Sequence, residues 1–110
     1  MASDAQNALA AALDRMWLQY LPLMRERVAI LESAARDFAA GDLSIERHEE
    51  ASAAAHKLAG VLGTFGLTRA TVLARELEII YTRQNGPDPE LAQNMTAIAA
   101  ELRTLIESRK

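Results

Sequence analysis

Residues 55 to 66 read AHKLAGVLGTFG and place one histidine in a stretch with the composition of a helix. Gly60, Gly63 and Gly66 follow His56 at four, seven and ten residues. An exposed glycine inside a helix costs about 1 kcal/mol relative to alanine. Gly60 therefore needs a reason, such as the close approach of another backbone or a ligand. Gly66 has a simpler role, because a glycine in the left-handed conformation commonly ends a helix.

Around His56 the predicted helix has one apolar face and one face of mostly small side chains. At about 100° per residue, the apolar residues gather opposite His56 and predict the buried face: Ala51, Ala54, Ala55, Leu58, Leu62 and Phe65. Apart from Glu49, the residues nearest to His56 are small: Ser52, Ala53, Ala59, Gly60 and Gly63. We therefore expect an exposed imidazole that can attack a group carried by a second protein. The alternative is an ordinary surface histidine on an alanine-rich helix.

Capping residues and helix breakers divide the rest of the chain. The boundaries are marked by Ser3 with Gln6, Pro22, Gly41-Asp42 with Ser44, Gly66, and Asn85-Gly86-Pro87. They predict helices over residues 4–20, 21–40, 45–64, 68–84 and 89–107, each with apolar residues spaced by three and four. No strand pattern is present. The expected fold is all-α: an antiparallel up-down four-helix bundle, with an additional N-terminal helix lying against one side or end.

Composition excludes several classes of protein. The 110 residues are enough for one domain. The net charge of −3 argues against a nucleic-acid surface, which needs a basic face. No apolar run approaches the ~20 residues of a membrane span, and the N-terminus lacks the basic lead of a secretory signal. The absence of cysteine excludes disulfides and thiolate metal sites and suits the cytoplasm.

Two further patterns are weak. His48 lies among Glu46, Glu49 and Glu50, but helical di-iron sites use Glu-x-x-His pairs, which this sequence lacks. We therefore predict a polar helix start and no metal site. Residues 66–72 are faintly similar to a helix-turn-helix segment, and the acidic composition disfavours that interpretation.

A wider motif surrounds the histidine. The run His56-Lys57-Leu58-Ala59-Gly60, with Gly66 and the later Leu77-Glu78, resembles the histidine-containing phosphotransfer (HPt) domain family. That family's motif has the form H-x-L-K-G, with a glycine ten residues after the histidine and a later L-E. The motif spans about 23 residues, and the expected four-helix bundle extends the likeness to nearly the whole chain.

The resemblance implies a phosphorelay intermediate with His56 as the phosphoacceptor. A receiver domain of a response regulator, or a hybrid sensor histidine kinase, would supply the phosphoryl group, and another receiver would take it. Mg²⁺ would come from the receiver, so that this chain binds no cofactor of its own. The sequence has no phosphate-binding loop for ATP, which implies a phosphocarrier that does not phosphorylate itself. The resemblance also implies a monomer.

One position departs from the motif. The family often has lysine three residues after the histidine, where this chain has Ala59. Lys57 lies about 100° from His56 around the helix and would reach the phosphoryl group poorly. The expected surroundings of the phosphoryl group are Ser52, Lys57, Ala59, Gly60 and Gly63. The missing lysine leaves a second interpretation open, a helical interaction module that keeps the HPt shape without carrying phosphate.

A second apolar stripe on the 21–40 helix suggests a docking surface. Leu23 and Ile30 lie away from the main stripe, and a turn at Gly41-Asp42 would bring the level of Val28 to Ile30 alongside His56. We expect this stripe either to dock the receiver or to pack against the N-terminal helix. Arg69 is a further docking candidate, because it follows the helix break after the His56 helix.

Overall fold

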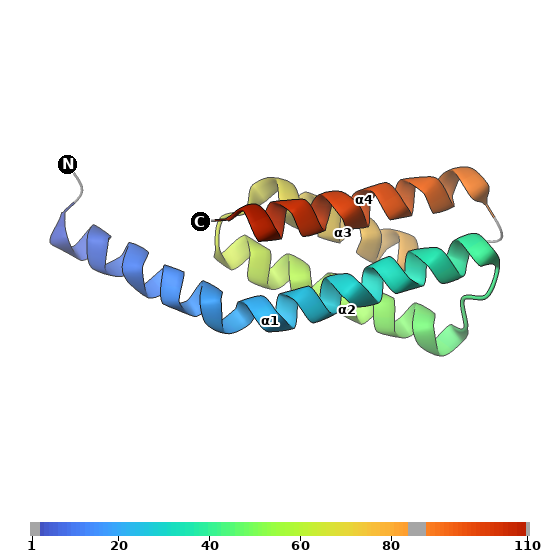
Figure 1. Cartoon of the computed structure of the whole chain (residues 1–110), viewed down its shortest axis with the longest axis horizontal. Coiled ribbons are helices and arrows are strands. Elements are labelled where there is room, and N and C mark those ends of the chain that lie inside the picture. The colour runs from blue at the N-terminus through green and yellow to red at the C-terminus, as the bar shows by residue number, and fades with distance from the viewer. Residues whose placement is uncertain (1–2, 84–87, 110) are drawn as a thin grey trace.

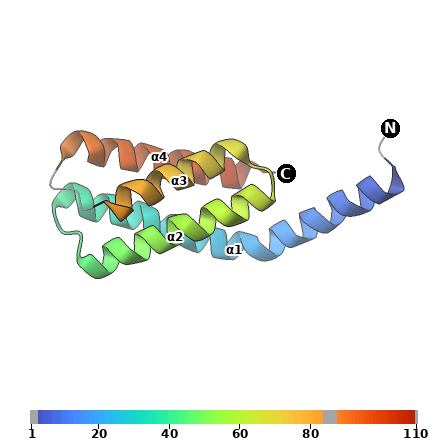
Figure 2. The same ribbon diagram turned by 180° about the vertical axis from the view of Figure 1, so that it is seen from behind.

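The computed structural model describes residues 3–83 and 88–109, and over these residues it contains four α-helices (Figure 1). They are α1 (Asp4–Ala40), α2 (Ile45–Thr64), α3 (Thr68–Thr82) and α4 (Pro89–Ser108). Each helix packs against two neighbours, in the pairs α1–α2, α2–α3, α3–α4 and α4–α1. Figure 2 shows the same closed arrangement from behind. The all-α bundle is confirmed, and α2 has the predicted bounds.

The helix ends follow the local signals in the sequence. Ser3 and Gln6 form a capping box at the start of α1, and the Ser44 hydroxyl accepts a hydrogen bond from the Arg47 backbone at the start of α2. Gly41 and Gly66 both have left-handed backbone conformations, with φ of 75° and 73°. After each of these glycines the chain turns back with the hydrogen bonds of a Schellman motif. The predicted stop at residues 85–87 lies outside the described residues.

The predicted boundary at Pro22 is wrong. α1 continues through Pro22 as one helix of 37 residues, so the additional N-terminal helix does not exist as a separate element. Proline removes one backbone hydrogen bond and crowds the carbonyl four residues earlier, that of Leu18. Trp17 and Met24 are buried on either side of this defect and hold the helix in place, while Pro22 itself is exposed. α1 bends where it enters the bundle instead of ending there (Figure 1).

Because Pro22 lies inside a helix, replacing it should stabilise the protein. Pro22→Ala restores the missing hydrogen bond and is expected to raise the free energy of unfolding by roughly 1–3 kcal/mol. Urea denaturation followed by far-UV circular dichroism measures the change. Ala29→Gly, at an exposed position of the same helix, is the control and should lower stability by about 1 kcal/mol. An unchanged or lower stability of Pro22→Ala would show that the proline favours the native conformation.

The core lies between the four helices. The predicted buried stripe of α2 is confirmed for Ala51, Ala54, Ala55, Leu58 and Leu62, and Phe65 packs against it from the end of the helix. Trp17 and Phe65 meet edge to face at 5.1 Å between ring centroids and close one end of the core. Among the described residues, no helix combines the length and the apolar character needed to cross a lipid bilayer.

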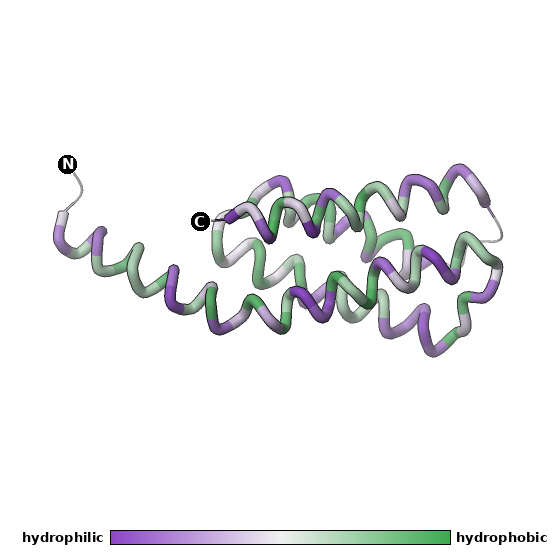
Figure 3. The backbone as a smooth tube through the Cα atoms, viewed as in Figure 1, coloured by the Kyte–Doolittle hydropathy of each residue, from purple (hydrophilic) through white to green (hydrophobic). Residues whose placement is uncertain are grey.

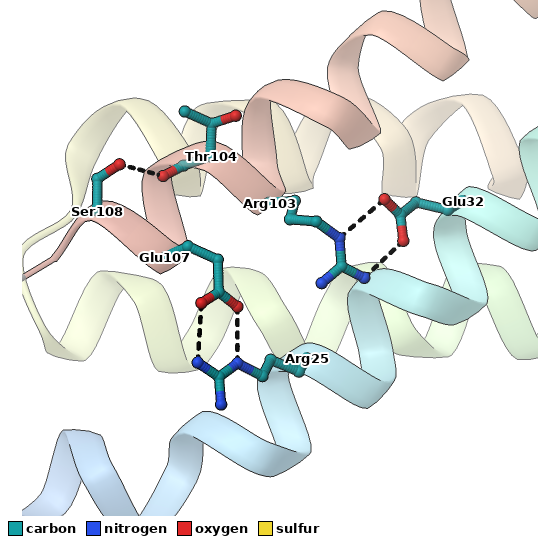
Figure 4. Close-up of polar contacts among 6 residues, drawn as sticks. All are labelled: Arg25, Glu32, Arg103, Thr104, Glu107 and Ser108. Carbon is teal, nitrogen blue, oxygen red and sulfur yellow. Dashed lines mark hydrogen bonds and ion pairs between the residues drawn. The ribbon is translucent and has the colours of Figure 1, made fainter.

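Two bidentate ion pairs join α1 to α4 (Figure 4). Arg25 donates to Glu107 at 2.7 and 2.8 Å, and Arg103 donates to Glu32 at 2.9 and 2.6 Å. The Glu32–Arg103 pair is the less exposed of the two. The hydrogen bonds from Arg103 hold the pKa of Glu32 below its ordinary value of 4.5. The pairs fix the register of the two helices along the bundle.

The lowered pKa of Glu32 makes this pair sensitive to acid. The stabilisation from the ion pair is fully present above the ordinary carboxyl pKa. It is lost as the pH falls through the lowered pKa of the folded state, because Glu32 then becomes protonated. Glu32→Gln should cost about 0.5–1 kcal/mol of unfolding free energy at pH 7, and this cost should shrink as the pH falls and Glu32 becomes protonated. Denaturation curves between pH 2.5 and 7 give the measurement, with Glu26→Gln as the control at an exposed site. An equal loss at both ends of the pH range would exclude the ion pair as the cause.

Candidate functional site

His56 projects from the middle of α2 with 70% of its side chain exposed. Its Nδ1 lies 2.6 Å from Oε2 of Glu78, which α3 supplies from the neighbouring side of the bundle. The Glu78 side chain is only one-quarter exposed, so the carboxylate is held against the helices while the imidazole reaches into solvent. The exposed position of His56 is the one that the sequence predicts.

The contact with Glu78 decides which nitrogen of His56 can react. A carboxylate can only accept hydrogen bonds, so Nδ1 of His56 carries the proton and donates it. In the neutral imidazole Nε2 then holds the free lone pair. Because the ring is bound at Nδ1 and otherwise exposed, Nε2 is the nitrogen available to an incoming group. The site thus presents an oriented, exposed imidazole nitrogen on α2.

The α2–α3 hairpin explains how Glu78 reaches His56. In an antiparallel pair, residues at equal distances from the turn lie at the same level, and His56 and Glu78 are each 11 residues from Leu67. Ser52 and Thr82 obey the same rule and lie 3.4 Å apart. Glu78 belongs to the sequence motif around His56, but the motif alone assigns it no role. The equal spacing of His56 and Glu78 about the Gly66-Leu67 turn is the signal in the sequence for their contact.

Ala53, Gly60 and Gly63, three of the small residues predicted near His56, are exposed. A side chain at Gly60 would meet nothing within 4 Å, so the surface there is open. A Cβ added at Gly63 would lie 3.9 Å from the Thr71 side chain of α3. Lys57 is exposed, one position after the histidine. A bulky partner can therefore come close to Nε2 without displacing side chains of this helix.

The comparisons with known proteins agree with this geometry. Residues 15–108 match the family model of the Hpt domain. The chain belongs to the Hpt family. Members of this family carry phosphoryl groups on histidine in phosphorelays and interact there with receiver domains. The resemblance drawn from the His56 motif is therefore confirmed at the level of the family.

The chain is also similar to a curated protein. Protein RcaC of Microchaete diplosiphon is 32% identical over 105 residues, which is 96% of this chain. The chain spans only 16% of the length of RcaC. No solved structure matches the chain.

Ala59, where Hpt domains often have lysine, does not lie on the exposed surface around His56. It is 1% exposed, so its predicted place beside the phosphoryl group is wrong. The helical wheel assumed one buried stripe, but α2 packs against both α1 and α3 and buries a wider arc. Ser52 lies on the same side of His56 as Ala59, and its hydroxyl is 3.4 Å from that of Thr82 of α3. In this Hpt domain, position 59 therefore belongs to the core rather than to the open surface.

The three docking candidates lie apart from the immediate surroundings of His56. Leu23 is 39% exposed on α1, while Ile30 is half-buried and packs against the core. The interpretation that Leu23 packs against a separate N-terminal helix is wrong, because that helix does not fold back. Arg69 forms an ion pair with Glu101 of α4 at 2.9 Å. None of the three lines the groove beside His56.

That groove, of about 770 Å³, runs from His56 along α2 towards the α1–α2 connection. His48 lines it, with Nε2 3.2 Å from the backbone oxygen of Arg83 and its ring edge-on to Tyr81. His48 thus has a structural role in the hairpin. Across the described residues, no three histidine, aspartate or glutamate side chains gather closely enough to hold a metal ion.

Tyr81 carries a buried hydroxyl that has no hydrogen-bond partner among the described residues. Burial raises the pKa of this phenol above its ordinary value. Tyr81→Phe removes a polar group that is costly to bury and should raise the free energy of unfolding by about 1 kcal/mol. Thermal denaturation tests this, with Tyr20→Phe at an exposed position as the control. A clear loss of stability would reveal a partner for the hydroxyl, such as a bound water.

Proposed function

We propose that this chain is a phosphorelay intermediate in which His56 is the phosphoacceptor. It takes a phosphoryl group from the phospho-aspartate of a receiver domain, or from a hybrid sensor histidine kinase, and passes it to another receiver. The observation that carries this proposal is the oriented imidazole. Glu78 binds Nδ1 at 2.6 Å and leaves Nε2 exposed.

The transfer exchanges one bond to phosphorus for another. The lone pair on Nε2 attacks in line, a P–N bond forms, and the P–O bond to the aspartyl carboxylate breaks. The carboxylate leaves with the electron pair, and the ring becomes an imidazolium that still donates its Nδ1 proton to Glu78. The negative charge of Glu78 stabilises this cation. The reverse sequence returns the phosphoryl group to an aspartate.

Most of the charge stabilisation would come from the partner. The receiver would provide Mg²⁺ and cationic groups around the transferring oxygens, as phosphoryl transfer requires. Lys57 is the closest cationic residue to His56 in the sequence and can approach the phosphoryl oxygens only from the side. Without an ATP-binding motif, the chain acts as a phosphocarrier and not as a kinase. We place this function in the cytoplasm and expect no nucleic-acid or membrane partner.

Receiver docking would use the open surface over Gly60 and the part of α1 that packs beside α2, but not the projecting N-terminal turns of α1. Asp37 and Arg47 form an ion pair at 3.4 Å, and each lies five residues from Asp42. By the same equal spacing about Asp42, Val28 of α1 is expected at the level of His56 in the antiparallel α1–α2 pair. Of the predicted docking residues, Leu23 is the more exposed apolar side chain and Ile30 offers only part of its surface. Arg69 would have to leave Glu101 in order to bind the receiver.

The interaction-module alternative rested on Ala59. Because Ala59 is buried between helices, its small side chain has a packing explanation that does not involve the loss of phosphotransfer. No other observation favours the alternative.

The proposal is tested by incubating the chain with a radiolabelled phosphorylated receiver and Mg²⁺. We expect label on this chain with the acid-labile, base-stable behaviour of a phosphoramidate, and transfer of that label to a second receiver. Circular dichroism confirms that the protein is folded. A folded chain that takes no label from any of several receivers would support the interaction module instead.

A further inference from the structure

The N-terminal part of α1 projects beyond the bundle (Figures 1 and 2). Its 37 residues make α1 about 55 Å long, whereas α2 and α4, with 20 residues each, reach about 30 Å. No described residue before Trp17 is buried. Asp14 reaches back to Arg109 at 3.3 Å, at the end of the bundle. The first turns of α1 therefore lie in solvent.

The sequence specifies a helix in this projecting part despite its lack of support. The capping box of Ser3 and Gln6 satisfies the first backbone groups of α1. Ala5, Ala8 and the run from Ala10 to Ala12 favour the helical conformation. A helical segment shorter than about 12–15 residues is marginal in water unless something packs against it. No described residue of this capped, alanine-rich part before Trp17 is buried, so its apolar side chains are open to a partner.

The projecting part carries an apolar seam with the spacing of a coiled coil. The seam consists of residues separated by four, three and four positions: Leu9, Leu13, Met16 and Tyr20. Leu9 is 62% exposed, Met16 is also exposed, and Leu13 is half-buried. Tyr20 is exposed on one side, while its ring packs edge to face on Phe65 of the same chain. Figure 3 shows apolar residues recurring along this part of the chain. An alternation of four and three is the heptad pattern that pairs one helix with another.

The charge of this region narrows the choice of partner. Between Ser3 and Tyr20 the ionisable residues are Asp4, Asp14 and Arg15. An anionic membrane or a nucleic acid would require a basic face, which a single arginine does not provide. Two copies of this nearly neutral helix would not repel each other. The same seam on both copies is self-complementary, as a two-fold interface requires.

We infer that this chain forms a two-fold symmetric dimer in which the projecting parts of α1 pair through the seam of Leu9, Leu13, Met16 and Tyr20. The partner is a second copy of the same chain. This departs from the monomer that the family resemblance implied. The family match begins at residue 15, so the outer half of the seam lies beyond the part shared with the Hpt model.

The seam is short, and its length limits the expected affinity of the dimer. Residues Asp4 to Tyr20 form a paired length of about 25 Å. This buries less than the roughly 1,200–2,000 Å² of a standard stable interface. We therefore expect a concentration-dependent dimer with a dissociation constant of about 1–100 μM.

Sedimentation equilibrium of the 110-residue chain from about 1 to 500 μM tests the inference. The wild type should shift from monomer to dimer over this range. Leu9→Lys puts a charge into the seam and should weaken dimerisation at least ~30-fold. The matched control is Leu18→Lys. Leu18 is 67% exposed but lies about 180° from Leu9 around the helix, so this variant should dimerise like the wild type.

Three results would overturn the inference. They are a monomeric wild type at every concentration, a dimer that Leu9→Lys leaves intact, and equal weakening by the two lysine variants. Circular dichroism of each variant excludes unfolding as the cause. Because His56 lies on α2 and not on the projecting part of α1, phosphoryl acceptance by Leu9→Lys should match that of the wild type. A failed dimer test therefore leaves the proposed phosphotransfer function unaffected.

Discussion

His56→Gln is expected to reduce phosphoryl acceptance from a receiver to background, a loss of at least ~10³-fold, because no other group takes over from a missing nucleophile. Glutamine keeps the polarity and approximate length of histidine but has no nitrogen lone pair that can form a stable bond to phosphorus. His56 is exposed, so the fold should be unaffected. The measurement is the initial rate of label transfer from a phosphorylated receiver with Mg²⁺.

The matched control for this variant is His48→Gln. His48 is on the same helix and lines the same groove, but its Nε2 is bound to the backbone oxygen of Arg83. It should accept label at a rate close to that of the wild type. Retention of label by His56→Gln, or its loss in His48→Gln alone, would place the phosphoacceptor elsewhere.

The second large effect concerns Glu78, the residue that positions the imidazole. Glu78→Ala removes the acceptor for the Nδ1 proton, so the ring can rotate and can place its proton on Nε2. We expect transfer to slow by about 10- to 100-fold, by analogy with the loss of a carboxylate that orients a metal-binding histidine. Glu76→Gln, an exposed change on the same helix, should leave the rate unchanged.

A spectroscopic measurement distinguishes loss of the positioning of the His56 ring from a general disturbance of the fold. The ¹⁵N chemical shifts of His56 report which nitrogen carries the proton. In the wild type Nδ1 should be protonated, and Glu78→Ala should show an increased fraction of the Nε2-protonated form. A slower rate without any change in the tautomer would mean that Glu78 acts in another way, for example through the partner interface.

The sequence could predict those features that depend on neighbouring residues in the chain. Ser3 with Gln6, Ser44 and Gly66 set helix ends through backbone hydrogen bonds within one or two turns. The exposed position of His56 follows from the periodicity of α2 alone. These are local properties, and the structure agrees with each of them.

Features that depend on packing could not be predicted in the same way. Pro22 predicts a helix boundary because proline inside a helix lowers the stability of that helix. Buried residues on both sides nevertheless keep α1 continuous. The periodicity of α2 predicts an exposed Ala59, because periodicity alone does not show that a second helix packs against α2. The role of Glu78 required the register of the α2–α3 hairpin, although its equal distance from Leu67 was already present in the sequence.

The central claim is that Glu78 holds the Nδ1 proton of His56 and so directs the phosphoryl group to Nε2. Its most direct test is an NMR experiment on the ¹⁵N-labelled chain, phosphorylated by a receiver, that detects coupling between phosphorus and the imidazole nitrogens. We predict coupling to Nε2 of His56, with Nδ1 still protonated. Coupling to Nδ1 of His56, or to a nitrogen of His48, would contradict the account.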